Sequence, residues 1–193
     1  MRYLISVLAT LIMVGLPQAN RSAIGQDQLS LPGEICEWFV NQDGSCVQCS
    51  ISMCGVWQLT PQAATLLFDT DYGRKVRGGS GPSRVEAYAE SRSIPIYNVT
   101  GSNTWDWMKW AAKTGRMSAI GCFGRHFQTL LWFNPDPNDP KPWKVRNNWH
   151  NTTDKTMEYT EAEFRRHHLN SGQWVVILDT PPPPMPHKYV KWW

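Results

Sequence analysis

The feature that most constrains the fold and function of this chain is the junction at Cys46, where a polar turn leads into an apolar helix. Residues 41–49 read Asn-Gln-Asp-Gly-Ser-Cys-Val-Gln-Cys, in which Gly44 permits the positive φ of a turn and Ser45 suits a helix N-cap. Apolar and small residues then recur at three- and four-residue spacing to Trp57, which predicts a helix with one buried face. A thiol in the first turn meets unpaired backbone N–H groups and the positive end of the helix dipole, and both favour thiolate. The sequence therefore predicts a nucleophilic cysteine at this junction.

Further along the chain, helical patterns come first and β-type runs later. Pro95 confines a short extended segment at 94–97 to a sheet edge, and Thr160 with Glu163 predicts a capping box. The order of elements predicts an α+β domain. We expect further helices at 60–69, 83–91 with Ser83 as its cap, 105–113 opened by Thr104, and 160–169. We expect strands at 116–122, 126–133, 144–147 and 174–179.

The two ends of the chain differ from its middle. An apolar run at 3–16 follows Arg2 and is shorter than the roughly 20 residues that span a bilayer. It predicts a signal peptide at 1–25 and export to the periplasm or medium without a stable membrane anchor; an uncleaved tether is the alternative. We expect one domain at 26–180 and a Pro-rich aromatic tail at 181–193, which offers a surface for a protein partner.

The net charge and the number of cysteines limit which classes of function this chain can have. A net charge of +3 over 193 residues, without a basic run, argues against a nucleic-acid partner. The five cysteines are an odd number, so in an oxidising compartment two disulfides would leave one thiol over. Cysteines on an apolar helix face commonly only pack, and this alternative applies most to Cys49 and Cys54.

Two later stretches carry groups that would complete a thiol site. A Gly-rich turn at 121–125 places His126 at the start of an apolar strand, where an imidazole can take a proton from a thiol and return it to a leaving group. Asn147, Asn148 and Trp149 end the next strand; an amide oxygen there would fix the imidazole tautomer, and an indole would exclude water. A histidine in a turn satisfied by backbone, and a plain Asn-Asn turn, are the structural alternatives.

Three short motifs in this order are similar to a known family. Gly-Ser-Cys-x-x-Cys opens the helix, Gly-x-His starts a strand, and Val-Arg-Asn-Asn-Trp ends the next strand. This pattern resembles the papain-like cysteine peptidases, including their bacterial branch, over about residues 35–179. The resemblance implies a nucleophile helix packed on an antiparallel sheet that carries His126 and Asn147, with Asn147 as the orienting amide and Trp149 as its shield.

The resemblance leaves the nucleophile and the oxyanion donor open. Papain itself has its nucleophile at the second cysteine of such a run, which would be Cys49, whereas the bacterial pattern places it at Cys46. We favour Cys46, because the effect of the helix dipole falls off within the first turn. The family glutamine that stabilises the oxyanion is replaced by another residue at the corresponding position, which leaves Asn41 or Gln42 as the amide donor.

Three function classes follow from these residues. We expect an exported cysteine peptidase or amidohydrolase that needs no cofactor and cleaves a peptide or peptide-like amide; a wall peptide is one substrate that the many tryptophans would suit. A papain-like domain without catalysis, serving in binding or assembly, is the second class. A metal or redox site is the third, in which Cys46, Cys49, Cys122 and His126 would form a tetrahedral set. We expect His167 and His168 to lie on a solvated helix face.

Overall fold

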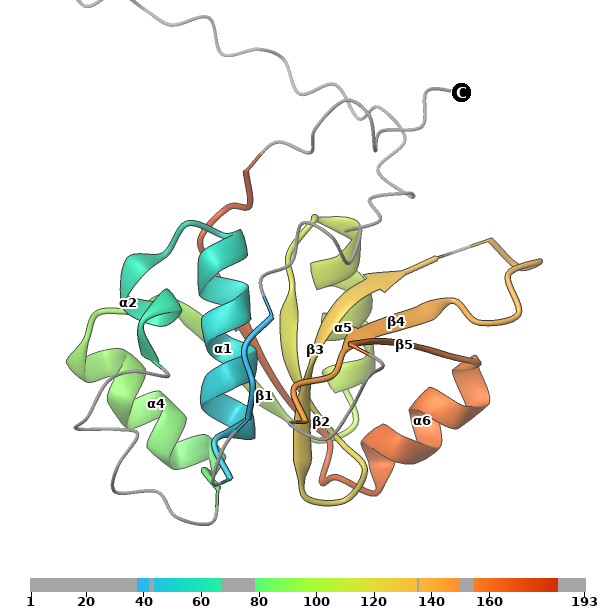
Figure 1. The fold of residues 1–193 in the computed structure, drawn as a ribbon, viewed down its shortest axis with the longest axis horizontal. Coiled ribbons are helices and arrows are strands. Elements are labelled where there is room, and N and C mark those ends of the chain that lie inside the picture. Colours follow the sequence, from blue (N-terminus) through green and yellow to red (C-terminus); the bar gives the residue numbers. More distant parts are fainter. Residues whose placement is uncertain (1–37, 42–43, 67–78, 135, 150–154, 184–193) are drawn as a thin grey trace, which may run out of the picture.

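The computed structural model describes residues 38–41, 44–66, 79–134, 136–149 and 155–183. In these residues six strands form one antiparallel sheet in the order β1-β6-β2-β3-β4-β5, with helices on both of its faces (Figure 1). The chain is therefore an α+β protein, as predicted. The strands are β1 (Ile96–Thr100), β2 (Ser118–Cys122), β3 (His126–Phe133), β4 (Trp143–Arg146), β5 (Thr156–Tyr159) and β6 (Trp174–Leu178).

Alternation along the central strands produces two hydrophobic cores. Ala119 and Val176 belong to the core on one face of the sheet, whereas their neighbours Ile120 and Val175 belong to the core on the other. Helices α1 (Cys46–Trp57), α2 (Pro61–Ala64) and α4 (Pro82–Ser91) cover the first face, and α5 (Thr104–Lys113) and α6 (Glu161–Leu169) cover the second. Figure 1 shows the first group on the left and α6 on the right.

Helix α1 is the central helix of its layer. Eleven of its 12 residues are buried, including the polar Gln48, Ser50 and Ser52, so the predicted single buried face is wrong. The reason is tertiary: α1 lies between the sheet and α2. A Cβ built on Gly55 would lie 2.2 Å from the backbone nitrogen of Ala64, so only glycine permits this approach of α2.

Several local predictions are confirmed. The capping box opens α6, since the Thr160 hydroxyl accepts from the Glu163 N–H while the Glu163 carboxylate accepts from the Thr160 N–H. Strand β3 has the predicted bounds, and β1 is an edge strand that begins directly after Pro95. The predicted Ser83 cap is wrong, because Pro82 takes the first helical position and Gly81 is the N-cap.

The edge strand β5 was not predicted. Its four residues include Glu158, whose carboxylate lies 2.6 Å from the Lys144 ammonium of β4. The strand has only four residues, one of them the strand-disfavouring Glu158, so its own sequence carries a weak β signal. The remaining strands end within a few residues of their predicted limits.

Other predictions concern residues outside the described ranges. The signal peptide at 1–25, Cys36, Gln42, residues 67–69 of the second predicted helix and residues 184–193 of the tail all lie there. In the described part of the chain, no helix has the length and apolar character needed to cross a membrane. No disulfide joins any two of the four described cysteines, Cys46, Cys49, Cys54 and Cys122.

Candidate functional site

The start of α1, the start of β3 and the end of β4 meet at one buried side chain. The amide nitrogen of Asn148, which carries two N–H groups, lies 3.1 Å from the carbonyl oxygen of Cys46, 3.0 Å from the carbonyl oxygen of Phe127 and 3.1 Å from the hydroxyl oxygen of Ser50. Asn148 is fully buried. One amide therefore fixes the helix that carries Cys46 against the strand that carries His126.

His126 is the first residue of β3 and is only 6% exposed. Its Nε2 lies 3.4 Å from Oδ1 of Asn147, and its ring centroid lies 4.8 Å from that of Trp149 at an interplanar angle of 38°. Oδ1 of Asn147 also accepts from the Trp149 backbone N–H at 3.2 Å, which orients the amide with its oxygen toward the imidazole. Nε2 therefore carries the ring proton and Nδ1 is left with its lone pair.

The thiol of Cys46 lies among backbone N–H groups. Those of Val47, in the first turn of α1, and of Phe127, directly after His126, both form hydrogen bonds with it and lower its pKa, as the sequence predicted for a helix start. Burial is the larger effect and raises the pKa of Cys46 above its ordinary value of 9.0. The resting thiol is therefore protonated, and the predicted thiolate is not the ground state.

Burial also favours the uncharged form of the His126 imidazole. It lowers the pKa of His126 to about 4, because the charged ring loses its hydration, while the hydrogen bond from Nε2 to Asn147 works against this change. At neutral pH both members of the pair are uncharged.

Cys49, the alternative nucleophile, lies one turn further along α1. It is fully buried, whereas Cys46 retains 6% exposure. Burial raises the pKa of Cys49 to about 12, and its sulfur lies 3.7 Å from the hydroxyl of Ser45. Of the two thiols, Cys46 is the one that a reagent or substrate reaches more readily.

Asn41 lies beside the start of α1. Its Oδ1 accepts from the Ser45 hydroxyl at 3.3 Å, which leaves the amide nitrogen as its donor end. Its backbone N–H donates to the Asn148 carbonyl at 2.6 Å, and it forms an isolated bridge with Trp149. The backbone of Asn41 is thus fixed on the segment that carries Asn147. Gln42, the other predicted oxyanion donor, is outside the described residues.

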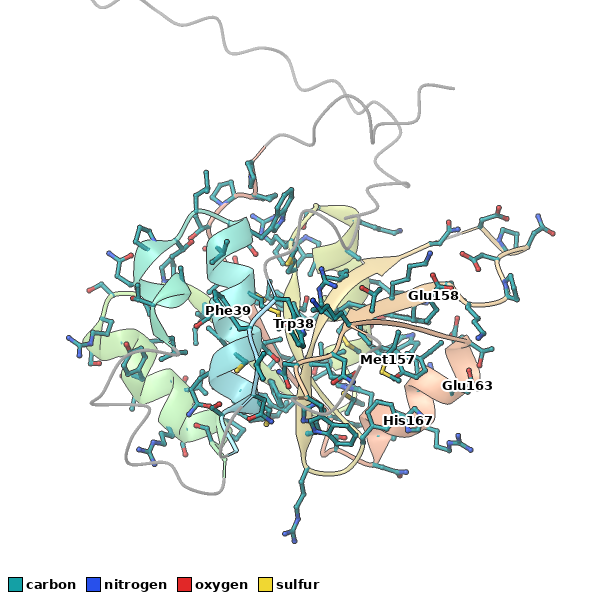
Figure 2. All side chains as sticks on the ribbon, in the orientation of Figure 1. Trp38, Phe39, Met157, Glu158, Glu163 and His167 are labelled. Carbon is teal, nitrogen blue, oxygen red and sulfur yellow. The ribbon has the colours of Figure 1, made fainter. Side chains whose placement is uncertain are left out.

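Two tryptophans flank the orienting amide. Trp149 covers His126 yet is 49% exposed itself, so it lies between the imidazole and solvent. On the N-terminal segment, the indole N–H of Trp38 donates to the Asn147 carbonyl at 2.7 Å, and the Lys155 ammonium lies 4.3 Å from its ring centroid. Figure 2 shows Trp38 in the middle of the molecule. Asn147 is therefore held from the side by a residue more than one hundred positions away.

Sequence reasoning named Asn148 but missed its role in joining α1 to β3, and it missed Trp38 altogether. The role of Asn148 could have been found, because consecutive strand residues face opposite sides, so an Asn147 that meets the imidazole turns Asn148 toward α1. No local signal marks Trp38, since its partner is distant in sequence.

The other candidate residues, Cys122, His167 and His168, pack or form hydrogen bonds with groups other than Cys46. The Cys122 thiol donates to Oε1 of Gln128 at 3.1 Å in the core. His168 is buried, with its ring nitrogens 2.8 Å from the Gly121 carbonyl and 2.9 Å from the Thr104 hydroxyl, so the predicted solvated position is wrong. It fixes α6 to β2 and α5, whereas His167 packs 3.9 Å from the Phe123 ring.

The described residues form no group of three or more His, Cys, Asp and Glu side chains that could hold a metal ion. The tetrahedral set of Cys46, Cys49, Cys122 and His126 is therefore not assembled. What the structure does bring together is His126 on the Asn147 amide and, at the next strand residue, the Phe127 backbone N–H that forms a hydrogen bond with the Cys46 thiol. A thiol, an imidazole and an amide are the groups used in acyl transfer through a thioester. No family model matches the chain, and it matches no curated protein and no solved structure.

Proposed function

We propose that this chain is a papain-like thiol hydrolase that cleaves an amide bond in a peptide or peptide-like substrate. The observation that carries the proposal is the arrangement of His126, with Nε2 on the Asn147 amide and its ring under Trp149. A histidine that merely satisfied a turn would need neither partner. Asn148 links this group to the backbone of Cys46, so the three roles belong to one site.

The proposed reaction begins with attack of the Cys46 sulfur on the substrate carbonyl carbon. The thiol proton moves to Nδ1 of His126, because Nε2 already donates to Asn147. Collapse of the tetrahedral intermediate breaks the C–N bond, and the leaving amine takes the proton from His126. Water then hydrolyses the thioester, with His126 accepting its proton and returning it to the sulfur.

The oxyanion needs donors close to the attacking sulfur. In the proposal the backbone N–H of Cys46, at the start of α1, is one donor. The amide nitrogen of Asn41 is the other, since the Ser45 hydroxyl occupies its oxygen end. Removing one such donor typically slows catalysis about 10²–10³-fold. Asn41→Ala would therefore be slow rather than inert, while Asn41→Asp, which cannot donate in its ionised form, would be slow as well.

Burial favours one further candidate, a papain-like domain that binds without catalysis. Both Cys46 and His126 are uncharged at neutral pH because they are buried, and neither is more than 6% exposed. A site of this kind turns over only if substrate reaches the sulfur. The chemistry of the labelling experiment below separates the two candidates.

Location and partners complete the proposal. Export through a signal peptide at 1–25 would place the enzyme outside the cytoplasm, and the aromatic tail at 181–193 would bind a protein partner. None of the residues that the proposal assigns to the chemistry lies in either segment. Purified protein beginning near residue 26 should therefore carry the full activity.

The test uses a peptidyl acyloxymethyl ketone, which labels a thiol hydrolase in proportion to its ability to attack a carbonyl. We expect one label on Cys46 in the parent protein and in Cys49→Ala, and no label in Cys46→Ala. His126→Gln should keep its fold and lose about 10²–10⁴-fold in labelling rate. Labelling that persists in Cys46→Ala overturns the choice of nucleophile, and a folded parent protein without any label favours the binding domain.

A further inference from the structure

A corner of three aromatic rings lies on the α5 side of the sheet, on the face opposite α1. Tyr97 projects from β1, and Trp107 and Trp110 occupy neighbouring turns of α5. The Trp110 ring is nearly perpendicular to both others, at 88° to Tyr97 and 80° to Trp107, with centroids 5.6 and 5.4 Å away. The rings thus form two walls rather than a flat stack.

These rings line a hollow of about 420 Å³ together with Asp106. All three rings are half-buried and Asp106 is exposed, so the hollow opens to solvent. The Asp106 carboxylate is the one charged group among the four lining residues. Aromatic faces are electron-rich, and a carboxylate beside them adds to the negative potential.

The molecule already places a cation on this cluster. The Arg116 guanidinium lies 4.9 Å from the Trp110 centroid and donates to the Asp179 carbonyl. The Asp179 carboxylate in turn accepts from the Tyr97 hydroxyl at 2.8 Å. Beside the hollow, the carboxylates of Asp106 and Asp179 therefore accompany the guanidinium of Arg116.

We propose that this corner binds a quaternary ammonium group, such as the trimethylammonium end of a choline compound or of a methylated lysine. A quaternary ammonium carries its charge on methyl surface and has no N–H to satisfy, so ring faces and one carboxylate suffice for it. A sugar would need several hydrogen-bonding groups for its hydroxyls, and the lining supplies one carboxylate, two indole N–H groups and a phenol that already donates to Asp179. This site is independent of the function proposed for Cys46.

The test compares choline with 3,3-dimethyl-1-butanol, its uncharged isostere, by titration of the indole N–H resonances of ¹⁵N-labelled protein. We expect saturable shifts for Trp107 and Trp110 with choline. The isostere should bind at least about fivefold more weakly than choline, because only the cation is attracted electrostatically to the ring faces. Asp106→Asn should weaken choline binding about threefold, as expected for a charge pair that includes an exposed carboxylate.

Glu161→Gln is the matched control, since Glu161 is also an exposed carboxylate in the first turn of a helix. It should leave choline binding unchanged, and Trp107→Ala should abolish it. The proposal is overturned if the isostere binds as tightly as choline, if a methyl glucoside binds in place of choline, or if choline gives no saturable shift. Asp106→Asn changes only a surface charge, so it decides the matter even if Trp107→Ala fails to fold.

Discussion

Because the imidazole of His126 is buried, we expect the stability of the folded protein to depend on pH in a way that can be measured without a substrate. In the unfolded chain this ring titrates near 6.5, and in the folded protein burial lowers its pKa to about 4. Between these values the unfolded state binds a proton that the folded state does not, so stability is lost as pH falls through this range and is fully present above it. Since one pKa unit corresponds to about 1.4 kcal/mol, His126 makes the protein about 3 kcal/mol less stable at about pH 4 than at about pH 7.5.

The perturbation is His126→Gln, which keeps a hydrogen-bonding side chain and removes the titration. Urea unfolding free energies of both proteins would be measured at about pH 7.5 and about pH 4. Carboxylates and His168, whose pKa burial also lowers, titrate in both proteins and cancel in the comparison. We expect the parent to lose about 3 kcal/mol more than the variant over this interval.

An equal loss of stability in both proteins would refute the reasoning, because it would mean that the folded state protonates His126 as readily as the unfolded state does. An NMR titration checks the same point directly. The His126 ring should remain neutral until about pH 4. A ring that titrates near its ordinary value would show that water or a thiolate reaches it.

Three further predictions concern the surroundings of the site. Asn148→Ala removes the two N–H donors of a fully buried amide, which are shared among three acceptors, and should cost about 2–4 kcal/mol of unfolding free energy by urea titration; a smaller loss would show that water replaces the amide. Gly55→Ala should cost about 3 kcal/mol or more in the same assay, because α2 must move, whereas Gly124→Ala, at φ 79° in open space, should cost about 1 kcal/mol; equal costs would contradict the close approach of α2. Alkylation of Cys46 by limiting iodoacetamide should still rise with pH beyond 9.0, and a rate that levels off below about pH 8 would show a thiolate instead.

The sequence predicted correctly those elements whose ends are determined by residues close to them in sequence. The Thr160 to Glu163 capping box lies within four residues, and the strand beginning at His126 follows its Gly-rich turn directly. The start of α1 at Cys46 follows from the Gly44 and Ser45 turn in the same way, with Gly44 at φ 84°. Such signals need no knowledge of the rest of the fold.

The burial of α1 and its effect on the pKa of Cys46 could not be predicted from local sequence, because both result from packing between segments distant in the chain. Helix α1 carries Gln48 and Ser52, polar residues that indicate an exposed face, yet the sheet and α2 bury them. The same burial raises the pKa of Cys46 against the helix-start amides that predicted a thiolate. Local rules gave the sign of one electrostatic effect, while the burial that outweighs it appears only when distant segments meet.

The central claim is that Cys46 cleaves amide bonds with His126 as its proton carrier. The most direct measurement is incubation of the protein with a complex peptide library, followed by mass spectrometry of the new termini. The parent and Cys49→Ala should generate the same set of new termini, Cys46→Ala none, and His126→Gln the same set far more slowly. New termini that persist with Cys46→Ala, or a folded parent that generates none, would contradict the claim.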